Sequence, residues 1–119
     1  MEIDFILHEM TALKYFIPII IESNKLKIQS NFFCNWEVCK HKYCSIKKNK
    51  KTLNEISSFY NINIYDIRRL CNRKNPVLTV EDVGINEISY KNNLQKFYSI
   101  NYCGDYIHNY QSYKNKFEN

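Results

Sequence analysis

The chain has 119 residues and a mass of 14.4 kDa, which is enough for one domain core and too little for two cores of ordinary size. Hydrophobic residues at 45% and charged residues at 24% predict a packed domain and exclude wholesale disorder. Two glycines and two prolines exclude a Gly-rich phosphate loop and a Pro-rich linker, and the net charge of +5 suits polyanionic partners.

Residues 1–42 are predicted to be a β-rich N-terminal extension. Within it, residues 14–30 indicate a β-hairpin, because β-branched and aromatic residues flank a polar turn at residues 22–25. Pro18 would confine the first strand to a sheet edge. The apolar run 15–21 is seven residues long, so we expect no membrane span. Residues 3–10 fit a short helix or a strand, and the sequence leaves both open.

Cysteines and lysines dominate the next stretch. Cys34, Cys39, His41 and Cys44 offer enough soft ligands for a tetrahedral zinc ion, but their spacing differs from the Cys-x2-Cys turns of common zinc sites. Disulfides or unpaired thiols are therefore favoured, and we predict no metal and no other cofactor. Residues 38–54 contain six lysines and no carboxylate, which fits a solvated loop or a surface for polyanions.

Two short helices are predicted next. Thr52, with Glu55 three residues on, has the spacing of a capping box for a helix that ends near Asn61. A second helix over residues 63–72 is indicated by apolar residues at helical spacing, and Pro76 prevents its continuation. Residues 77–80 and 83–88 then read as extended segments that return to pair with a strand at residues 43–47.

Residues 90–119 form a Tyr-rich C-terminal extension, predicted to pack on the domain or to be partly helical. Its tyrosines recur at four-residue spacing, so on a helix they make one stripe. Such a stripe packs a helix onto a domain or, alternatively, stacks on sugars or bases. The stripe comprises Tyr98, Tyr102, Tyr106 and Tyr110.

Residues 43–89 resemble a LysM domain, a βααβ module that binds N-acetylglucosamine polymers. The resemblance rests on a Thr-Leu-x-x-Ile helix, a Tyr-Asn-Ile hinge and a second helix ending in Leu and Asn. It predicts an α+β fold in which a LysM-like βααβ unit is flanked by the N-terminal hairpin and the C-terminal extension. The matching residues are Thr52, Leu53, Ile56, Ser57, Tyr60, Asn61, Ile62, Ile64, Asp66, Ile67, Leu70 and Asn72.

The resemblance implies a carbohydrate-binding module for chitin or peptidoglycan, secreted or attached to a wall or cell surface. We expect it to be non-catalytic, because no Ser-His-Asp, Cys-His or paired-carboxylate spacing is present. Two loops would form the sugar groove, one before the first helix and one between the second helix and the last strand. Their residues are Asn49, Lys50, Lys51 and Thr52 on one side, and Asn75, Pro76, Val77 and Leu78 on the other.

A helix-turn-helix DNA-binding protein is the alternative interpretation of the same residues. The predicted helix 63–72 would then be the recognition helix in the major groove. The basic residues that would contact phosphates and bases are Arg68, Arg69, Arg73 and Lys74.

Overall fold

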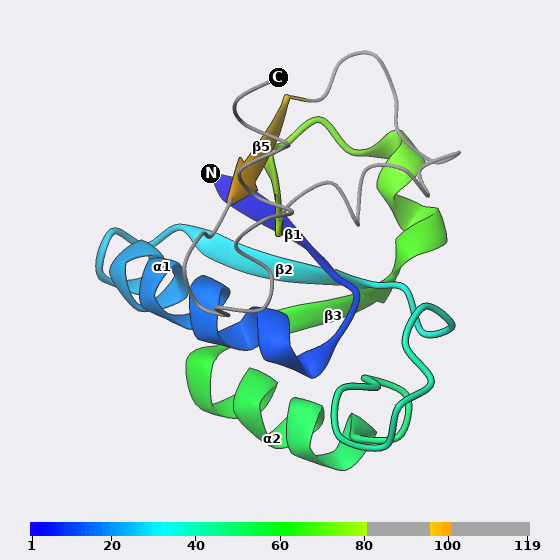
Figure 1. Cartoon of the computed structure of the whole chain (residues 1–119). Coiled ribbons are helices and arrows are strands. Elements are labelled where there is room, and N and C mark those ends of the chain that lie inside the picture. The colour runs from blue at the N-terminus through cyan, green and yellow to red at the C-terminus, as the bar shows by residue number, and fades with distance from the viewer. Residues whose placement is uncertain (81–95, 101–119) are drawn as a thin grey trace, which may run out of the picture.

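A computed structural model describes residues 1–80 and 96–100 and shows a small α+β domain, which confirms the predicted class (Figure 1). The strands are β1 (Glu2–Leu7), β2 (Gln29–Cys34), β3 (Ile62–Asp66), β4 (Val77–Val80) and β5 (Phe97–Ile100). The α-helices are α1 (Leu13–Lys25) and α2 (Lys50–Tyr60), and the 3-10 helices are η1 (Met10–Ala12) and η2 (Ile67–Asn72).

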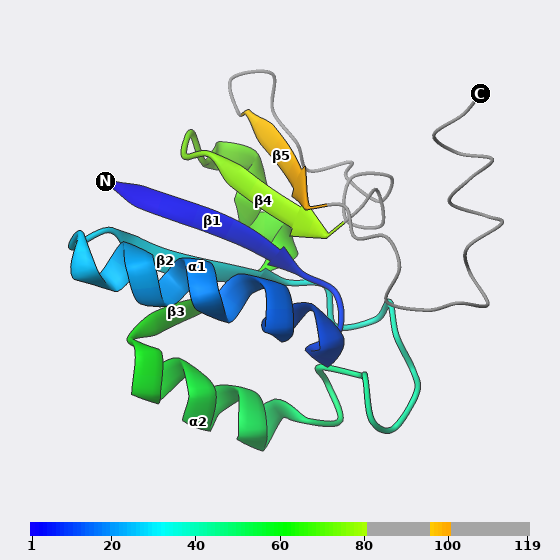
Figure 2. The same ribbon diagram turned by 60° about the vertical axis from the view of Figure 1, so that its left-hand side comes forward.

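The described strands form one sheet in the order β3-β2-β1-β4-β5, with every neighbouring pair parallel. The chain steps from β1 through β2 to β3 and then crosses to β4 on the other side of β1 (Figure 2). This arrangement is that of a doubly wound sheet, with its topological switch point between β1 and β4. Because the strands are parallel, all their C-terminal ends meet at one edge, here called the carboxyl edge, and their starts meet at the amino edge.

The two faces of the sheet are covered by different elements. Phe5 of β1 and Phe16 of α1 pack with ring centroids 4.9 Å apart, and Leu53 of α2 is buried in the same cluster. Side chains alternate along a strand, so the residue after Phe5 faces the other way. That second face is covered by η2, in a cluster of Ile6, Phe33, Ile67, Leu70 and Val77.

A polar network lies at the amino-edge half of the face covered by η2. Asp4 is fully buried, and it accepts hydrogen bonds from Arg73 Nη2 at 3.2 Å and Nε at 3.3 Å. Asn31 Nδ2 donates to the same carboxylate at 3.0 Å. The hydrogen bond to Asp4 raises the pKa of Arg73. The network thus joins the first strand to the segment between η2 and β4.

The predicted hairpin over residues 14–30 is wrong, since these residues form α1 and the start of β2. The β-branched run favoured a strand, but packing one face against the sheet outweighs local β propensity. Pro18 lies inside α1 at an exposed position. Proline has no N–H to donate to the carbonyl four residues earlier, and on this exposed side of the helix water can bond that carbonyl instead. The buried residues recur at helical spacing: Leu13, Phe16, Ile20 and Ser23.

The first predicted helix is confirmed as α2, and it ends at Asn61 in the left-handed conformation, with φ of 58°. Its beginning differs from the predicted capping box at Thr52 and Glu55. The carbonyl of Asn49 already accepts a hydrogen bond from Leu53 N at 3.0 Å, so the helix begins one turn earlier than predicted.

The second predicted helix, residues 63–72, is wrong. Ile62–Asp66 pair with β2 as a strand, and only the six residues that follow form η2. Ile62 and Ile64 both pack toward the α-helices, which is the two-residue period of a strand. The recognition helix of the DNA-binding interpretation is therefore absent from these residues.

Residues 77–80 are extended, as predicted, and form β4. They pair with β1 and β5 and not with residues 43–47, which form turns. The βααβ order is thus not found in the described part of residues 43–89. Tyr98 lies on β5 and not on a helix. The other predicted features of this region fall outside the described residues, namely the segment 83–88 and Tyr102, Tyr106 and Tyr110.

Candidate functional site at the carboxyl edge

The carboxyl edge beside the switch point is where doubly wound sheets place their ligands. His8 and Glu9 follow β1 at this edge, and Asn35 and Trp36 follow β2. Residues 35–49, here called the lysine loop, then lead into the first turn of α2. The loop and this turn hold the basic cluster noted in the sequence.

The lysine loop is fixed by hydrogen bonds and by burial. Met10 N donates to Cys44 O at 2.7 Å, which joins the loop to the segment after β1. The Asn49 amide donates to Lys42 O at 2.9 Å and to Ser45 O at 2.7 Å, so one side chain braces the loop. Ile46 is 1% exposed within the core. The loop therefore presents its outer side chains from a defined backbone.

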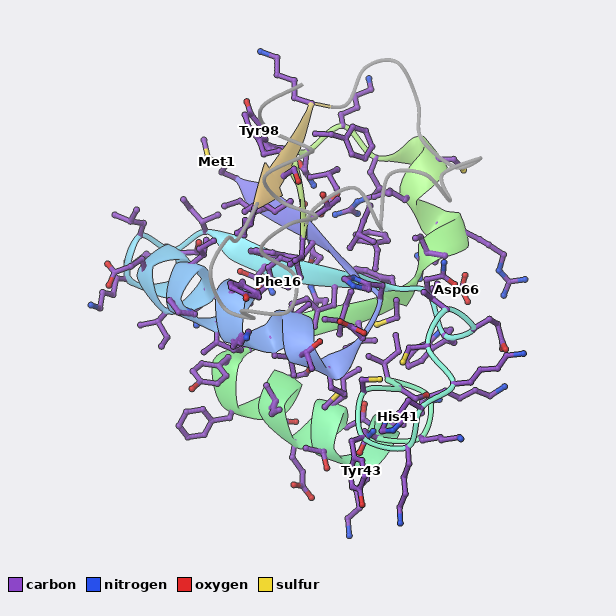
Figure 3. All side chains as sticks on the ribbon, viewed as in Figure 1. Met1, Phe16, His41, Tyr43, Asp66 and Tyr98 are labelled. Carbon is purple, nitrogen blue, oxygen red and sulfur yellow. The ribbon has the colours of Figure 1, made fainter. Side chains whose placement is uncertain are left out.

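Lysines alternate with the exposed rings of His41 and Tyr43 on the outside of this loop, and the half-buried Trp36 lies beside Lys50. Tyr43 is 75% exposed, and Lys42 Nζ lies 5.8 Å from the centre of its ring. Lys50 Nζ lies 5.3 Å from the centre of the Trp36 ring. Figure 3 shows His41 and Tyr43 projecting from the loop next to the start of α2. The six exposed lysines are Lys40, Lys42, Lys47, Lys48, Lys50 and Lys51.

The charge of this surface is mostly uncompensated by neighbouring carboxylates of the described chain. Lys47 pairs with Glu37 at 3.1 Å, with both side chains mostly exposed, and exposed pairs of this kind contribute only about 0–1 kcal/mol. Lys48 Nζ instead donates to the backbone carbonyl of Lys40 at 2.6 Å. The surface therefore has the charge and the rings to bind an acidic polymer.

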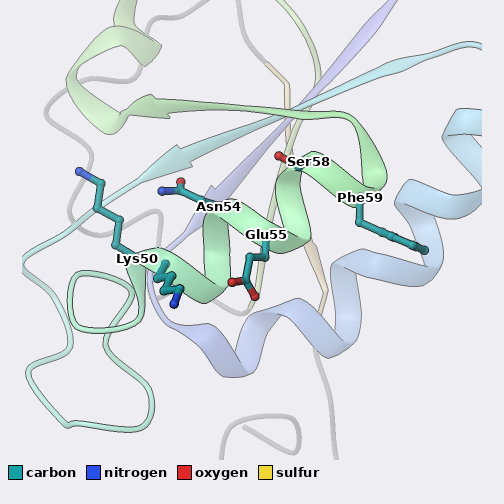
Figure 4. Close-up of a pocket in the computed structure, with 6 residues that line it drawn as sticks. Lys50, Asn54, Glu55, Ser58 and Phe59 are labelled. Atoms are coloured by element: carbon teal, nitrogen blue, oxygen red, sulfur yellow. The ribbon is translucent and has the colours of Figure 1, made fainter.

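A shallow open depression continues this surface along the exposed side of α2 (Figure 4). It begins at Lys50 and Lys51 and reaches Phe59, which is 81% exposed. At 1.5 Å per helical residue, Lys50 and Phe59 are about 14 Å apart along the axis. The depression is lined by Lys50, Lys51, Asn54, Glu55, Ser58 and Phe59.

The eight predicted ligand-binding residues fall into two separate groups. Asn49, Lys50, Lys51 and Thr52 lie together at the start of α2, at the carboxyl edge. Asn75, Pro76, Val77 and Leu78 lie where β4 begins, at the amino edge. There Pro76 O accepts a hydrogen bond from Asp4 N at 3.0 Å, and Val77 is buried. The two groups therefore do not face each other across one groove.

The cysteines also group differently from the pattern in the sequence. Burial raises the pKa of Cys34 to about 12, and this thiol lies in the core. His41 packs against Tyr43, with ring centroids 5.5 Å apart. Cys39 and Cys44 instead meet Glu9, with their ligand atoms all within 4.8 Å of one another. Spacing could not reveal Glu9, because it lies thirty positions before Cys39.

Arginines gather at a second place, on the face covered by η2. Arg69 lies over the Tyr65 ring, 4.7 Å from its centre, and Arg73 lies 5.4 Å from the centre of Phe33. Arg68 is paired with Asp66, whose pKa is lowered chiefly by hydrogen bonding to Arg68. Asp66 and Asp4 thus compensate two of the three positive charges of Arg68, Arg69 and Arg73.

No protein-family model matches the chain, and comparisons with curated proteins and with solved structures found no match. Within residues 1–80 and 96–100, no helix has the length and apolar character needed to cross a bilayer.

Proposed function

We propose that this chain is a non-catalytic binding domain for an acidic N-acetylglucosamine polymer of the peptidoglycan type. The binding surface comprises the lysine loop and the exposed side of α2. The observation that carries the proposal is the set of exposed lysines and rings on a braced loop at the carboxyl edge. Of the predicted ligand residues, Asn49, Lys50, Lys51 and Thr52 belong to this surface, and the group at the start of β4 does not.

The ligand class combines the sequence resemblance with the chemistry of the surface. N-acetylglucosamine polymers are the ligands implied by the sequence resemblance of residues 43–89 to LysM domains, of which the described fold has the first predicted helix, α2, but not the second. Peptidoglycan also carries carboxylates, which the lysines can pair with, whereas chitin is neutral. Exposed rings such as Tyr43 and Phe59 offer apolar faces for sugar rings. Peptidoglycan is therefore expected to bind more tightly than chitin.

A pull-down on insoluble peptidoglycan tests this surface with matched variants. Tyr43→Ala removes an exposed ring; if about 50 Å² of it is covered in the complex, affinity falls about tenfold. Lys50→Ala with Lys51→Ala should also weaken retention. Lys25→Ala with Lys74→Ala is the control, because it removes the same charge at the amino edge. Equal retention by all four proteins would contradict the proposal.

Single-stranded nucleic acid is the second candidate ligand, because alternating lysines and rings also suit a phosphate backbone with stackable bases. A gel-shift titration at several salt concentrations separates the two. Nucleic-acid binding would show a log–log slope of about −0.7 for each phosphate contacted. Tight, steeply salt-dependent binding of oligonucleotides without retention on peptidoglycan would favour this second candidate and overturn the first.

A further inference from the structure

The carboxyl edge also brings together three ligand groups that the proposed polymer-binding surface does not use. Glu9 follows β1, and Cys39 and Cys44 come from the lysine loop. One carboxylate oxygen and the two sulfur atoms all lie within 4.8 Å of one another, and all three residues are half-buried. These groups come from two separate stretches of chain and converge on one point.

The backbone holds this convergence in place. The hydrogen bond from Met10 N to Cys44 O fixes Cys44 next to Met10, the residue directly after Glu9. Ser45 N donates to His41 O at 2.9 Å, which closes the turn that contains Cys44. Buried Ser45 and Ile46 then hold that turn against the core. The three side chains therefore start from a defined framework.

Their separation and chemistry fit a tetrahedral transition-metal ion. Zinc bonds of about 2.0 Å to oxygen or nitrogen and 2.3 Å to sulfur place neighbouring ligand atoms roughly 3.3–3.8 Å apart. Side-chain movements of about 1 Å would close the three groups to that distance. Two sulfur ligands disfavour calcium and magnesium, which take oxygen, and favour zinc among the common divalent ions.

We propose that Glu9, Cys39 and Cys44 bind a zinc-type divalent ion, with His8 as the fourth ligand. The His8 Nε2 atom lies 3.7 Å from Glu9 Oε1, and rotation of its imidazole toward the two sulfur atoms would complete a four-ligand set. Each thiol that binds releases its proton to solvent. The ion ties the lysine loop to the end of β1, and this role holds whichever polymer the loop binds.

Cobalt(II) titration of the full chain under reducing conditions tests the site. The expected result is one equivalent of bound metal with a thiolate-to-cobalt charge-transfer absorption that zinc displaces. Cys39→Ser and Cys44→Ser should each weaken binding by more than the roughly 10–100-fold typical of losing a group that merely supports a ligand. Cys71→Ser is the matched control, because this cysteine lies on η2 and is exposed. An unchanged affinity in both site variants would overturn the proposal.

A second measurement keeps the test valid if a serine variant does not fold. In the unmodified chain, zinc should slow alkylation of Cys39 and Cys44 and leave the rate at Cys71 unchanged, as read by mass spectrometry of peptides. Glu9→Gln should weaken this protection. Equal alkylation rates with and without zinc, or binding of no metal by the reduced protein, would refute the site.

Discussion

Replacing Asp4 with alanine should destabilise the fold more than any exposed charge substitution. The Asp4 carboxylate is fully buried, whereas the side chain of Arg73 is 26% exposed. Removing one partner of a buried ion pair costs about 3–5 kcal/mol, because the other charge is left unpaired. Arg73 keeps some access to water and lies 3.5 Å from Glu2, so we expect the lower end, about 3 kcal/mol.

Urea unfolding followed by circular dichroism measures this cost. Asp4→Ala should lose about 3 kcal/mol, equivalent to a melting temperature roughly 10 °C lower. Glu22→Ala is the control, because the Glu22–Lys25 pair is exposed, and its loss should be within about 0.5 kcal/mol. Adding Arg73→Met completes a double-mutant cycle. A cost below about 1 kcal/mol for Asp4→Ala, or additive effects of the two substitutions, would refute the ion pair between Asp4 and Arg73.

Three further predictions concern single residues. Cys34 is buried and its pKa is raised to about 12, so iodoacetamide at pH 8 should modify exposed Cys71 at least about 100-fold faster than Cys34 in the native protein. Comparable rates at the two cysteines would contradict the burial of Cys34. The pKa of Asp66 is lowered, so the stability lost in Asp66→Asn should be constant above about pH 5 and disappear as acid protonates the native carboxylate; a loss that grows in acid would be the wrong sign. Asn61 has φ of 58°, so the free energy of unfolding of Asn61→Val should be lower than that of Asn61→Gly by about 1–2 kcal/mol. Identical melting curves of the two variants would argue against the left-handed conformation.

Local signals in the sequence predicted some elements and misread others. The helix 52–61 was predictable because its apolar spacing, and an asparagine suited to a left-handed turn, agree with its packing. Residues 13–25 were not predictable, because their β-branched residues favour a strand and Pro18 disfavours a helix interior. Only burial of one face against the sheet makes them helical. Residues 62–66 carry isoleucines that fit both periods, and pairing with β2 decides between them.

Of the candidate site, only the part formed by the lysines and residues 49–52 was predictable from the sequence. The lysines and Asn49 are adjacent in the sequence, so their shared surface follows from the loop itself. The expected partner loop at residues 75–78 depended on a βααβ chain path, whereas a parallel sheet places it at the opposite edge. Glu9 joins Cys39 and Cys44 through the parallel pairing of β1 with β2, which brings residues thirty positions apart to one edge.

Mapping amide chemical shifts during titration with soluble peptidoglycan fragments tests the proposed binding surface most directly. The proposal predicts that perturbed amides concentrate in residues 36–59, from the lysine loop along α2. Perturbations centred on residues 75–78, or none at saturating ligand, would contradict it.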